Sequence, residues 1–141
     1  MILLDAYGLV AFTLDEPAAD DVEELLRERQ CAMSSVNLAE AFDVLMRTRA
    51  LAPERVRAVV EPLLVEDIAV VDVPAAVAWR AAEFRMRHYH RRARPLSLAD
   101  CFLLAHADGD GVATADPAIA DVAREEGIAL VALPNSVGVR P

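Results

Sequence analysis

The sequence predicts an α/β fold with a central parallel sheet of five strands flanked by helices. Short apolar runs alternate with longer amphipathic segments along the chain, which is typical of βαβ units. The runs are apolar at successive positions, as expected for strands buried on both faces of a parallel sheet. With 141 residues, 55% of them hydrophobic, the chain has enough apolar material for a full core. We therefore expect residues 1–141 to form one domain.

Each strand is predicted from a short apolar run. The five runs are Ile2–Leu4, Cys31–Ser34, Ile68–Val73, Val112–Thr114 and Leu130–Leu133. Amphipathic patterns between them predict helices at Ala6–Phe12, Ala18–Arg29, Ser35–Arg49, Pro53–Leu64, Pro74–Arg91, Leu98–Ala107 and Pro117–Glu126. Three of these helices are expected to begin with proline, because the N–H group of the first helical residue has no partner in the helix.

The charge balance restricts the function. The chain has 23 Asp and Glu residues against 14 basic residues, a formal net charge of -9. Such a chain does not attract phosphate backbones over its whole surface, so any contact with nucleic acid must be local. All 14 basic residues are arginine. The lack of lysine argues against a Walker A phosphate loop, a pyridoxal Schiff base, and the acidic pockets of receiver domains and dehalogenase-type phosphatases.

The sequence also suggests where the protein resides. No apolar run approaches the roughly 18 residues of a membrane-spanning helix, and the first residues lack the basic segment of a signal peptide. We expect a cytoplasmic protein without membrane contact. Cys31 and Cys101 lie far apart and have no zinc-binding spacing, so both are expected to be small buried hydrophobic residues.

Two acidic residues follow predicted strands. Asp5 comes directly after Ile2–Leu4, at the carboxyl end of a strand, where open α/β sheets place their ligands. It is equally suited to cap the next helix. Asp116 follows Val112–Thr114 and precedes Pro117, an arrangement that alone favours an N-cap with a proline in the first turn.

A third acidic residue, Glu40, lies within a predicted helix. Its neighbours at i−4 and i+4 are Val36 and Val44, so its carboxylate shares a face with apolar side chains. A charge there is costly unless it is paired or bound to a metal. A Glu that extends to solvent is the alternative, and Asp43, one turn away, competes for any role given to Glu40.

The fourth acidic residue, Asp100, is the one carboxylate between Pro95 and Ala107. Ser97 and Asp100 have the spacing of a capping box. This cap would direct Asp100 toward the N-terminal end of its helix, where clefts at sheet ends lie, so a structural and a functional role are compatible. Four carboxylates in one cleft would repel one another unless a cation were bound. Mg²⁺ or Mn²⁺ suits oxygen ligands and supports metal-assisted phosphodiester hydrolysis.

Four segments together resemble the motif blocks of PIN-domain ribonucleases, with the closest likeness to VapC toxins of bacterial type II toxin–antitoxin pairs. The segments are Asp5–Phe12, Ser35–Leu45, Leu96–Ala107 and Thr114–Pro117. The resemblance implies a three-layer PIN-like fold with strand order 3-2-1-4-5. It implies a metal-binding catalytic set at Asp5, Glu40, Asp100 and Asp116. Thr114 would support this set, with Asp121 as a supporting or alternative fourth acid.

The same resemblance implies the activity and the partners. It implies an endoribonuclease that uses Mg²⁺ or Mn²⁺, a VapB-type antitoxin that covers the acidic cleft, and a homodimer within a toxin–antitoxin assembly. The alternative is a catalytically silent PIN fold that binds RNA or protein.

A local basic segment precedes Asp100. Six of the fourteen arginines lie between Arg80 and Arg94. We interpret Arg87, Arg91, Arg92 and Arg94 as RNA contacts, with Tyr89 available for base stacking. The alternative is a solvated helix end with cations near its C-terminus. Trp79 is expected in the core or at a dimer contact, and His106 is expected to be a structural histidine.

Overall fold

The computed structural model describes residues 1–28, 30–107 and 109–141. It contains a five-stranded parallel sheet with the order β3-β2-β1-β4-β5, which confirms the expected topology. The strands are β1 (Ile2–Leu4), β2 (Cys31–Ser34), β3 (Ile68–Val71), β4 (Gly111–Thr114) and β5 (Ala129–Ala132). β1 therefore lies at the centre, between β2 and β4.

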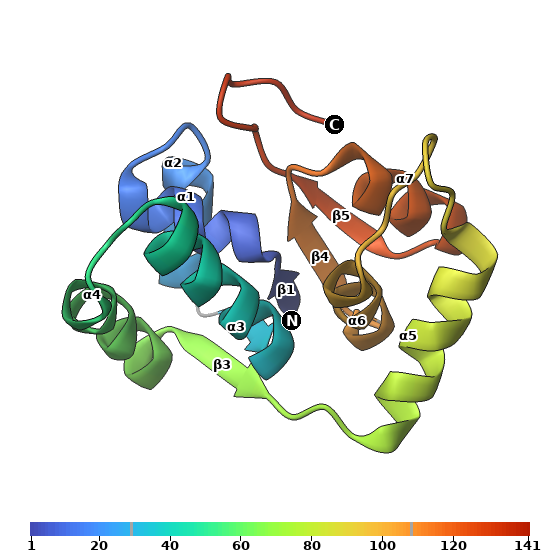
Figure 1. The fold of residues 1–141 in the computed structure, drawn as a ribbon, viewed down its shortest axis with the longest axis horizontal. Helices are drawn as coiled ribbons and strands as arrows, with labels where there is room; N and C mark the ends of the chain where they lie inside the picture. Colours follow the sequence, from blue (N-terminus) through green and yellow to red (C-terminus); the bar gives the residue numbers. More distant parts are fainter. Residues whose placement is uncertain (29, 108) are drawn as a thin grey trace.

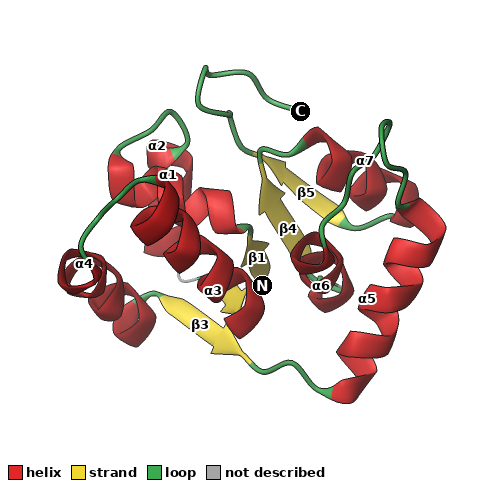
Figure 2. Cartoon of the chain, in the orientation of Figure 1, coloured by secondary structure: helices red, strands yellow, loops and turns green. Residues whose placement is uncertain are grey.

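Helices cover both faces of the sheet. One group comprises α1 (Ala6–Leu14), α2 (Ala19–Arg27), α3 (Ser35–Asp43), the π-helix η1 (Val44–Thr48) and α4 (Pro53–Glu66). The other comprises α5 (Ala75–His88), α6 (Leu98–His106) and α7 (Pro117–Glu126). Figures 1 and 2 show the first group on one side of the sheet and the second group on the other. The architecture thus has three layers.

Adjacent strand residues point into different cores. Leu4 and Met33 belong to the hydrophobic cluster under the first helix group, whereas Leu3 and Ala32 belong to the cluster under the second. This alternation follows from the period of two along a strand. It explains why the central strands are apolar at every position, as the sequence pattern indicated.

The expectation that every strand is buried on both faces is wrong for the two edge strands. Ala69 and Val70 in β3 and Ala129 in β5 are exposed. Each edge strand has a neighbouring strand on only one side and lies at the margin of the sheet. The helices therefore cover it less completely than they cover the central strands. β3 also ends at Val71 and not at Val73, because its partner β2 offers only four residues for pairing.

Two predicted helices end differently from the expectation. The segment Ser35–Arg49 is α-helical only to Asp43 and continues as the π-helix η1. The helix predicted to reach Arg91 ends at His88, because Tyr89 is extended and the chain then forms a tight turn. In that turn the His90 ring accepts hydrogen bonds from the backbone N–H groups of Arg92 and Ala93.

The other helices lie close to their predicted ranges. Pro53 and Pro117 occupy first helical positions as expected, whereas Pro74 stands one residue before α5. The predicted end of the second helix at Arg29 lies outside the described residues. Within the described ranges, no helix combines the length and apolar character needed to cross a membrane.

The structure tests the expected surroundings of four single residues. Cys31 and Cys101 are buried free thiols, as expected, and burial raises the pKa of each to about 11. His106 is a structural residue whose ring nitrogens contact the carbonyl oxygens of Phe102 and Asp72, at 3.0 and 2.9 Å. Trp79 is not in the core, since 74% of it is exposed.

Candidate metal and active site

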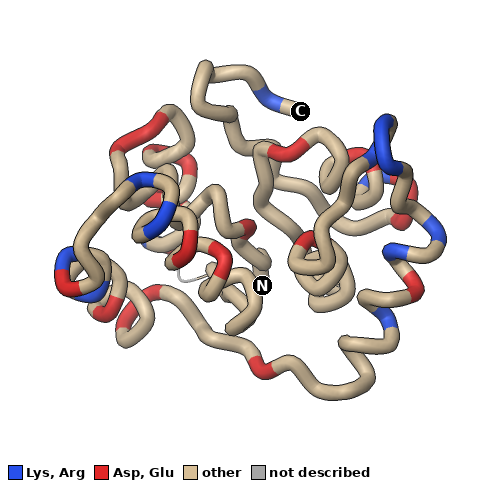
Figure 3. Tube along the Cα trace, in the orientation of Figure 1, with Lys and Arg blue, Asp and Glu red and all other residues tan. Residues whose placement is uncertain are grey.

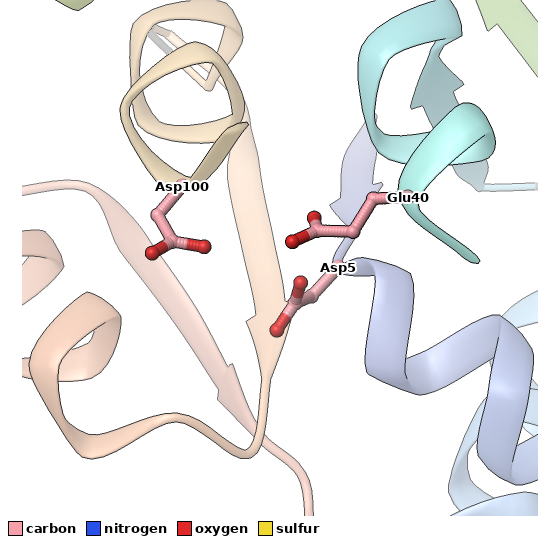
Figure 4. A group of neighbouring side chains, drawn as sticks. All are labelled: Asp5, Glu40 and Asp100. Carbon is pink, nitrogen blue, oxygen red and sulfur yellow. The ribbon is translucent and has the colours of Figure 1, made fainter. Parts of the chain in front are cut away.

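Three carboxylates from separate elements converge at the carboxyl end of the sheet. Asp5 follows β1, Glu40 lies on α3 and Asp100 lies in the first turn of α6. One oxygen of each lies within 4.8 Å of the others. Figure 4 shows the three side chains pointing toward one another. The residues are far apart in sequence, and the parallel topology brings them to one edge.

Asp5 is held by a hydrogen bond and not by a helix-capping role. It occupies the N-cap position of α1 but makes no side-chain cap bond. Instead the Thr114 hydroxyl donates to Asp5 Oδ2 at 2.7 Å, and the same oxygen of Thr114 accepts from the Asp116 backbone N–H at 3.0 Å. Thr114 and Asp5 are both buried. Asp5 therefore occupies the predicted N-cap position, but its side chain accepts from Thr114 and does not cap the helix.

Glu40 turns into the site, whereas Asp43 turns away. Asp43 is on the protein surface, where the Arg47 guanidinium contacts both of its carboxylate oxygens. That pairing lowers the pKa of Asp43. Glu40 is half-buried, and its Oε2 is buried without a hydrogen-bond partner. An unpartnered carboxylate oxygen beside two other acids is consistent with a cation ligand.

Asp100 combines a cap with a place in the site. Its Oδ2 accepts from the Ser97 backbone N–H at 2.5 Å, and its own N–H donates to the Ser97 hydroxyl at 3.0 Å. This capping box is the predicted one. The buried Asn37 amide on α3 donates to the Ala99 carbonyl at 3.2 Å. It thus ties α3 to the first turn of α6, a role that the sequence analysis missed because Asn37 carries no motif signal by itself.

Asp116 and Asp121 lie outside the compact group of three. Asp116 lines the same pocket but is exposed, and its Oδ1 caps α7 by accepting from the N–H groups of Ala118 and Ile119. The structure does not bring Asp121 to the pocket lining. Its carboxylate instead pairs with Arg124 at 3.3 Å on the surface of α7.

Burial and mutual repulsion make the cluster costly without a cation. The pKa of Asp5 is raised to about 7, and burial is the largest cause. Repulsion from Asp100, Glu40 and Asp116 acts in the same direction, whereas the Thr114 hydrogen bond opposes the rise. Burial, followed by repulsion from Asp100, also raises the pKa of Glu40. Burial raises that of Asp100, against the Ser97 hydrogen bonds. A set of hard oxygen donors under such repulsion fits a divalent cation such as Mg²⁺ or Mn²⁺.

A pocket of about 460 Å³ opens over the carboxylates. Besides the acids, its lining includes Tyr7 on α1, Arg49 after η1, and Asn135 and Ser136 in the segment after β5. The sequence patterns did not indicate these four residues. Their places depend on long-range packing, and no local pattern signals them.

The basic segment is divided between ion pairs and an exposed turn. Arg94 contacts both oxygens of Glu125, at 2.5 and 2.9 Å, and Arg87 contacts Glu126 at 3.0 Å. Arg91 and Arg92 are exposed in the turn after α5. Figure 3 shows these basic positions along α5 and in the following loop. The predicted helix Pro74–Arg91 ends at His88, so Arg91 lies in this turn together with Arg92 and not on the helix.

Replacing Thr114 by Val is expected to lower stability by about 1–3 kcal/mol. The substitution preserves shape but leaves Asp5 Oδ2 and the Asp116 N–H without their shared partner. Thermal unfolding measures the loss, and Thr114→Ser, which keeps the hydroxyl, is the matched control. Equal melting temperatures for the Val and Ser variants would show that the hydroxyl contributes nothing.

Comparisons with known proteins concern the family and the fold. Residues 2–133 match the PIN domain. A comparison with curated protein sequences finds no match. Among solved structures, Rickettsia felis VapBC2, bound to a DNA fragment from its promoter, gives a TM-score of 0.67 at 18% identity and covers 93% of this chain and 98% of that one.

Two further structures share the fold. Mycobacterium tuberculosis VapC20, described as a toxin that cleaves the sarcin–ricin loop, gives a TM-score of 0.66 at 20% identity, with 100% of both chains covered. A toxin–antitoxin complex from Klebsiella pneumoniae gives 0.58 at 18% identity, covering 82% of this chain and 87% of that one. At these identities the likeness concerns the fold.

Proposed function

This chain belongs to the PIN domain family, and we therefore propose that it is a metal-dependent endoribonuclease and the VapC-type toxin of a toxin–antitoxin pair. One observation carries the proposal: Asp5, Glu40 and Asp100 converge with their oxygens within 4.8 Å of one another in an open pocket. The fold shared with VapC20 and VapBC2 supports the same activity class.

In the proposed reaction, Asp5, Glu40 and Asp100 hold Mg²⁺ or Mn²⁺, and Asp116 contributes a further negative charge at the pocket wall. When bound, the divalent ion supplies an acidified water and positive charge at the phosphodiester. Thr114 fixes the orientation of Asp5, and the Ser97 cap fixes that of Asp100. Hydrolysis adds the water oxygen to phosphorus, breaks one P–O bond and leaves a proton on the departing oxygen.

The RNA path is proposed to include the basic segment. Arg91 and Arg92 are exposed on the turn after α5, and the ion pairs of Arg87 and Arg94 with α7 anchor that turn. The Arg85 guanidinium lies over the Tyr89 ring, 4.8 Å from its centroid. This stack offers a cationic and aromatic surface beside the basic turn, suited to phosphates and bases.

The proposed protein partners are a VapB-type antitoxin and a second copy of this chain. VapBC2 and the Klebsiella toxin–antitoxin complex share this fold, which supports the antitoxin. On α5, Trp79 is 74% exposed and Met86 is 80% exposed. Large apolar side chains in solvent are typical of protein contacts, so the dimer-contact interpretation of Trp79 is retained. We propose that the protein acts in the cytoplasm.

Cleavage of total RNA by the purified protein tests the proposed activity. We expect discrete cuts with Mg²⁺ or Mn²⁺ that disappear with EDTA and in Asp100→Asn, because both changes prevent metal binding. Asparagine at this position retains a side-chain oxygen that can accept the hydrogen bond from the Ser97 backbone N–H. Circular dichroism verifies that the variant is folded. If the folded, metal-loaded protein without antitoxin cuts no RNA, the catalytically silent binding module is the better description.

A further inference from the structure

Arg49 places a positive charge in a pocket that otherwise gathers acids. It lines the same 460 Å³ pocket as Asp5, Glu40, Asp100 and Asp116. The described lining contains no second arginine. A phosphate that approached the pocket would meet four carboxylates. The positive charge of Arg49 at the pocket wall would reduce the repulsion between these carboxylates and an entering polyanion.

An ion pair between distant parts of the chain holds Arg49 in place. Its Nη2 lies 2.5 Å from Glu16 Oε1, and Glu16 follows α1 in the sequence. The Glu16 side chain is only 14% exposed, whereas that of Arg49 is 41% exposed. A largely buried carboxylate thus anchors the guanidinium of a partly exposed arginine in the pocket lining.

The backbone on both sides of this ion pair is unusual. Among the described residues, the two non-glycine residues with positive φ are Asp15 and Ala50, each at 56°. Asp15 directly precedes Glu16, and Ala50 directly follows Arg49. A left-handed alanine costs about 1–2 kcal/mol, and Arg49 also follows η1, a π-helical turn of the kind found at functional sites. The fold therefore sustains local strain at the segment that presents Arg49.

We propose that Arg49 binds an RNA phosphate adjacent to the scissile phosphodiester, with Glu16 as its positioning residue. This inference rests on the proposed nuclease function. A guanidinium has five N–H donors in a planar fork suited to phosphate. The described structure gives the Arg49 side chain one hydrogen-bond partner, Glu16 Oε1 on Nη2. Donors on the guanidinium therefore remain for a phosphate, and the Glu16 contact keeps the fork pre-oriented.

Arg47 provides a matched control. It lies two residues earlier, is also paired with an acid, Asp43, and has the same charge. Its side chain is 72% exposed, and it is absent from the described pocket lining. Arg49→Gln and Arg47→Gln thus make the same change in net charge, and they differ in whether the lost charge faces the pocket.

The experiment measures the affinity of a short single-stranded RNA between about 50 and about 200 mM salt, with Ca²⁺ replacing Mg²⁺ and the RNA checked for integrity. We expect Arg49→Gln to weaken binding about tenfold at low salt. The slope of log affinity against log salt should fall by about 0.7, the value of one lost phosphate contact on a single strand. Arg47→Gln should match the unsubstituted protein, and Arg49→Lys should restore most of the slope.

Steady-state cleavage adds a second readout. Glu16→Gln keeps the arginine charge but removes its anchor, so KM should rise more than kcat falls. Equal salt slopes for Arg49→Gln and Arg47→Gln would overturn the proposed subsite, even if the protein cuts RNA. If the protein cuts no RNA although the two slopes differ, the nuclease function fails and the phosphate-binding role of Arg49 stands. Melting temperatures of all variants identify any that are misfolded.

Discussion

Replacing Glu40 by Gln is expected to reduce RNA cleavage by at least about 100-fold, the order seen when one preorganised electrostatic group is removed from an active site. The substitution keeps the size of the side chain but removes one of the three converging negative charges. Mn²⁺ binding should weaken by at least about tenfold. Cleavage rates and calorimetric titration with Mn²⁺ measure the two effects.

Asp43→Asn is the control for that experiment. Asp43 lies three residues from Glu40 on the same helix, but its carboxylate pairs with Arg47 on the surface. Its loss should leave both cleavage and Mn²⁺ binding close to those of the unsubstituted protein. If the two variants lose activity equally, the cluster that contains Glu40 is not the metal site, and the assignment of Glu40 would have to be abandoned.

The metal-free protein is expected to become less stable as the pH rises from about 5 to about 8. The pKa of Asp5 is about 7 in the folded protein, compared with 3.8 as its ordinary value. Between these values the folded state binds more protons than the unfolded state, so the free energy of unfolding falls with pH. The stabilising effect of the neutral Asp5 is complete below the unfolded pKa and is lost as the pH passes the folded pKa.

The pKa values of Glu40 and Asp100 are also raised, so both residues contribute in the same direction. The change attributable to Asp5 is on the order of 4 kcal/mol at most, or roughly 10 °C in Tm for a chain of this size. Melting curves in EDTA across the pH range measure it. Asp5→Asn, which cannot ionise, should show a much flatter dependence on pH.

Divalent metal should reverse this trend. Metal binds the ionised carboxylates of the folded state, so the increase in Tm on adding Mn²⁺ should grow with pH. In Asp5→Asn the increase should be small at every pH. A melting temperature that does not depend on pH, either in EDTA or in Mn²⁺, would contradict two claims. It would show that the carboxyl groups of Asp5, Glu40 and Asp100 do not have raised pKa values and that they do not bind the metal.

Local patterns were sufficient to predict several features of the site. The capping box at Ser97 and Asp100 depends on residues three apart, and the Asp116 cap depends on the proline that follows it. The apolar neighbours of Glu40 indicated that its carboxylate does not lie on a solvated face. Each of these signals lies within one turn of helix, so the sequence displays it directly.

From the sequence alone, the alternation of strands and helices could be predicted, with Asp5 directly after a strand, Glu40 within a helix and Asp100 in the first turn of another helix. Which of the acids meet depends on the tertiary structure. It set Asp116 on the pocket wall and Asp121 on the surface, although both follow β4 closely. It also joined Arg49 to Glu16 across 33 residues. Such contacts depend on how separate helices pack over the sheet, and no short stretch of sequence records that packing.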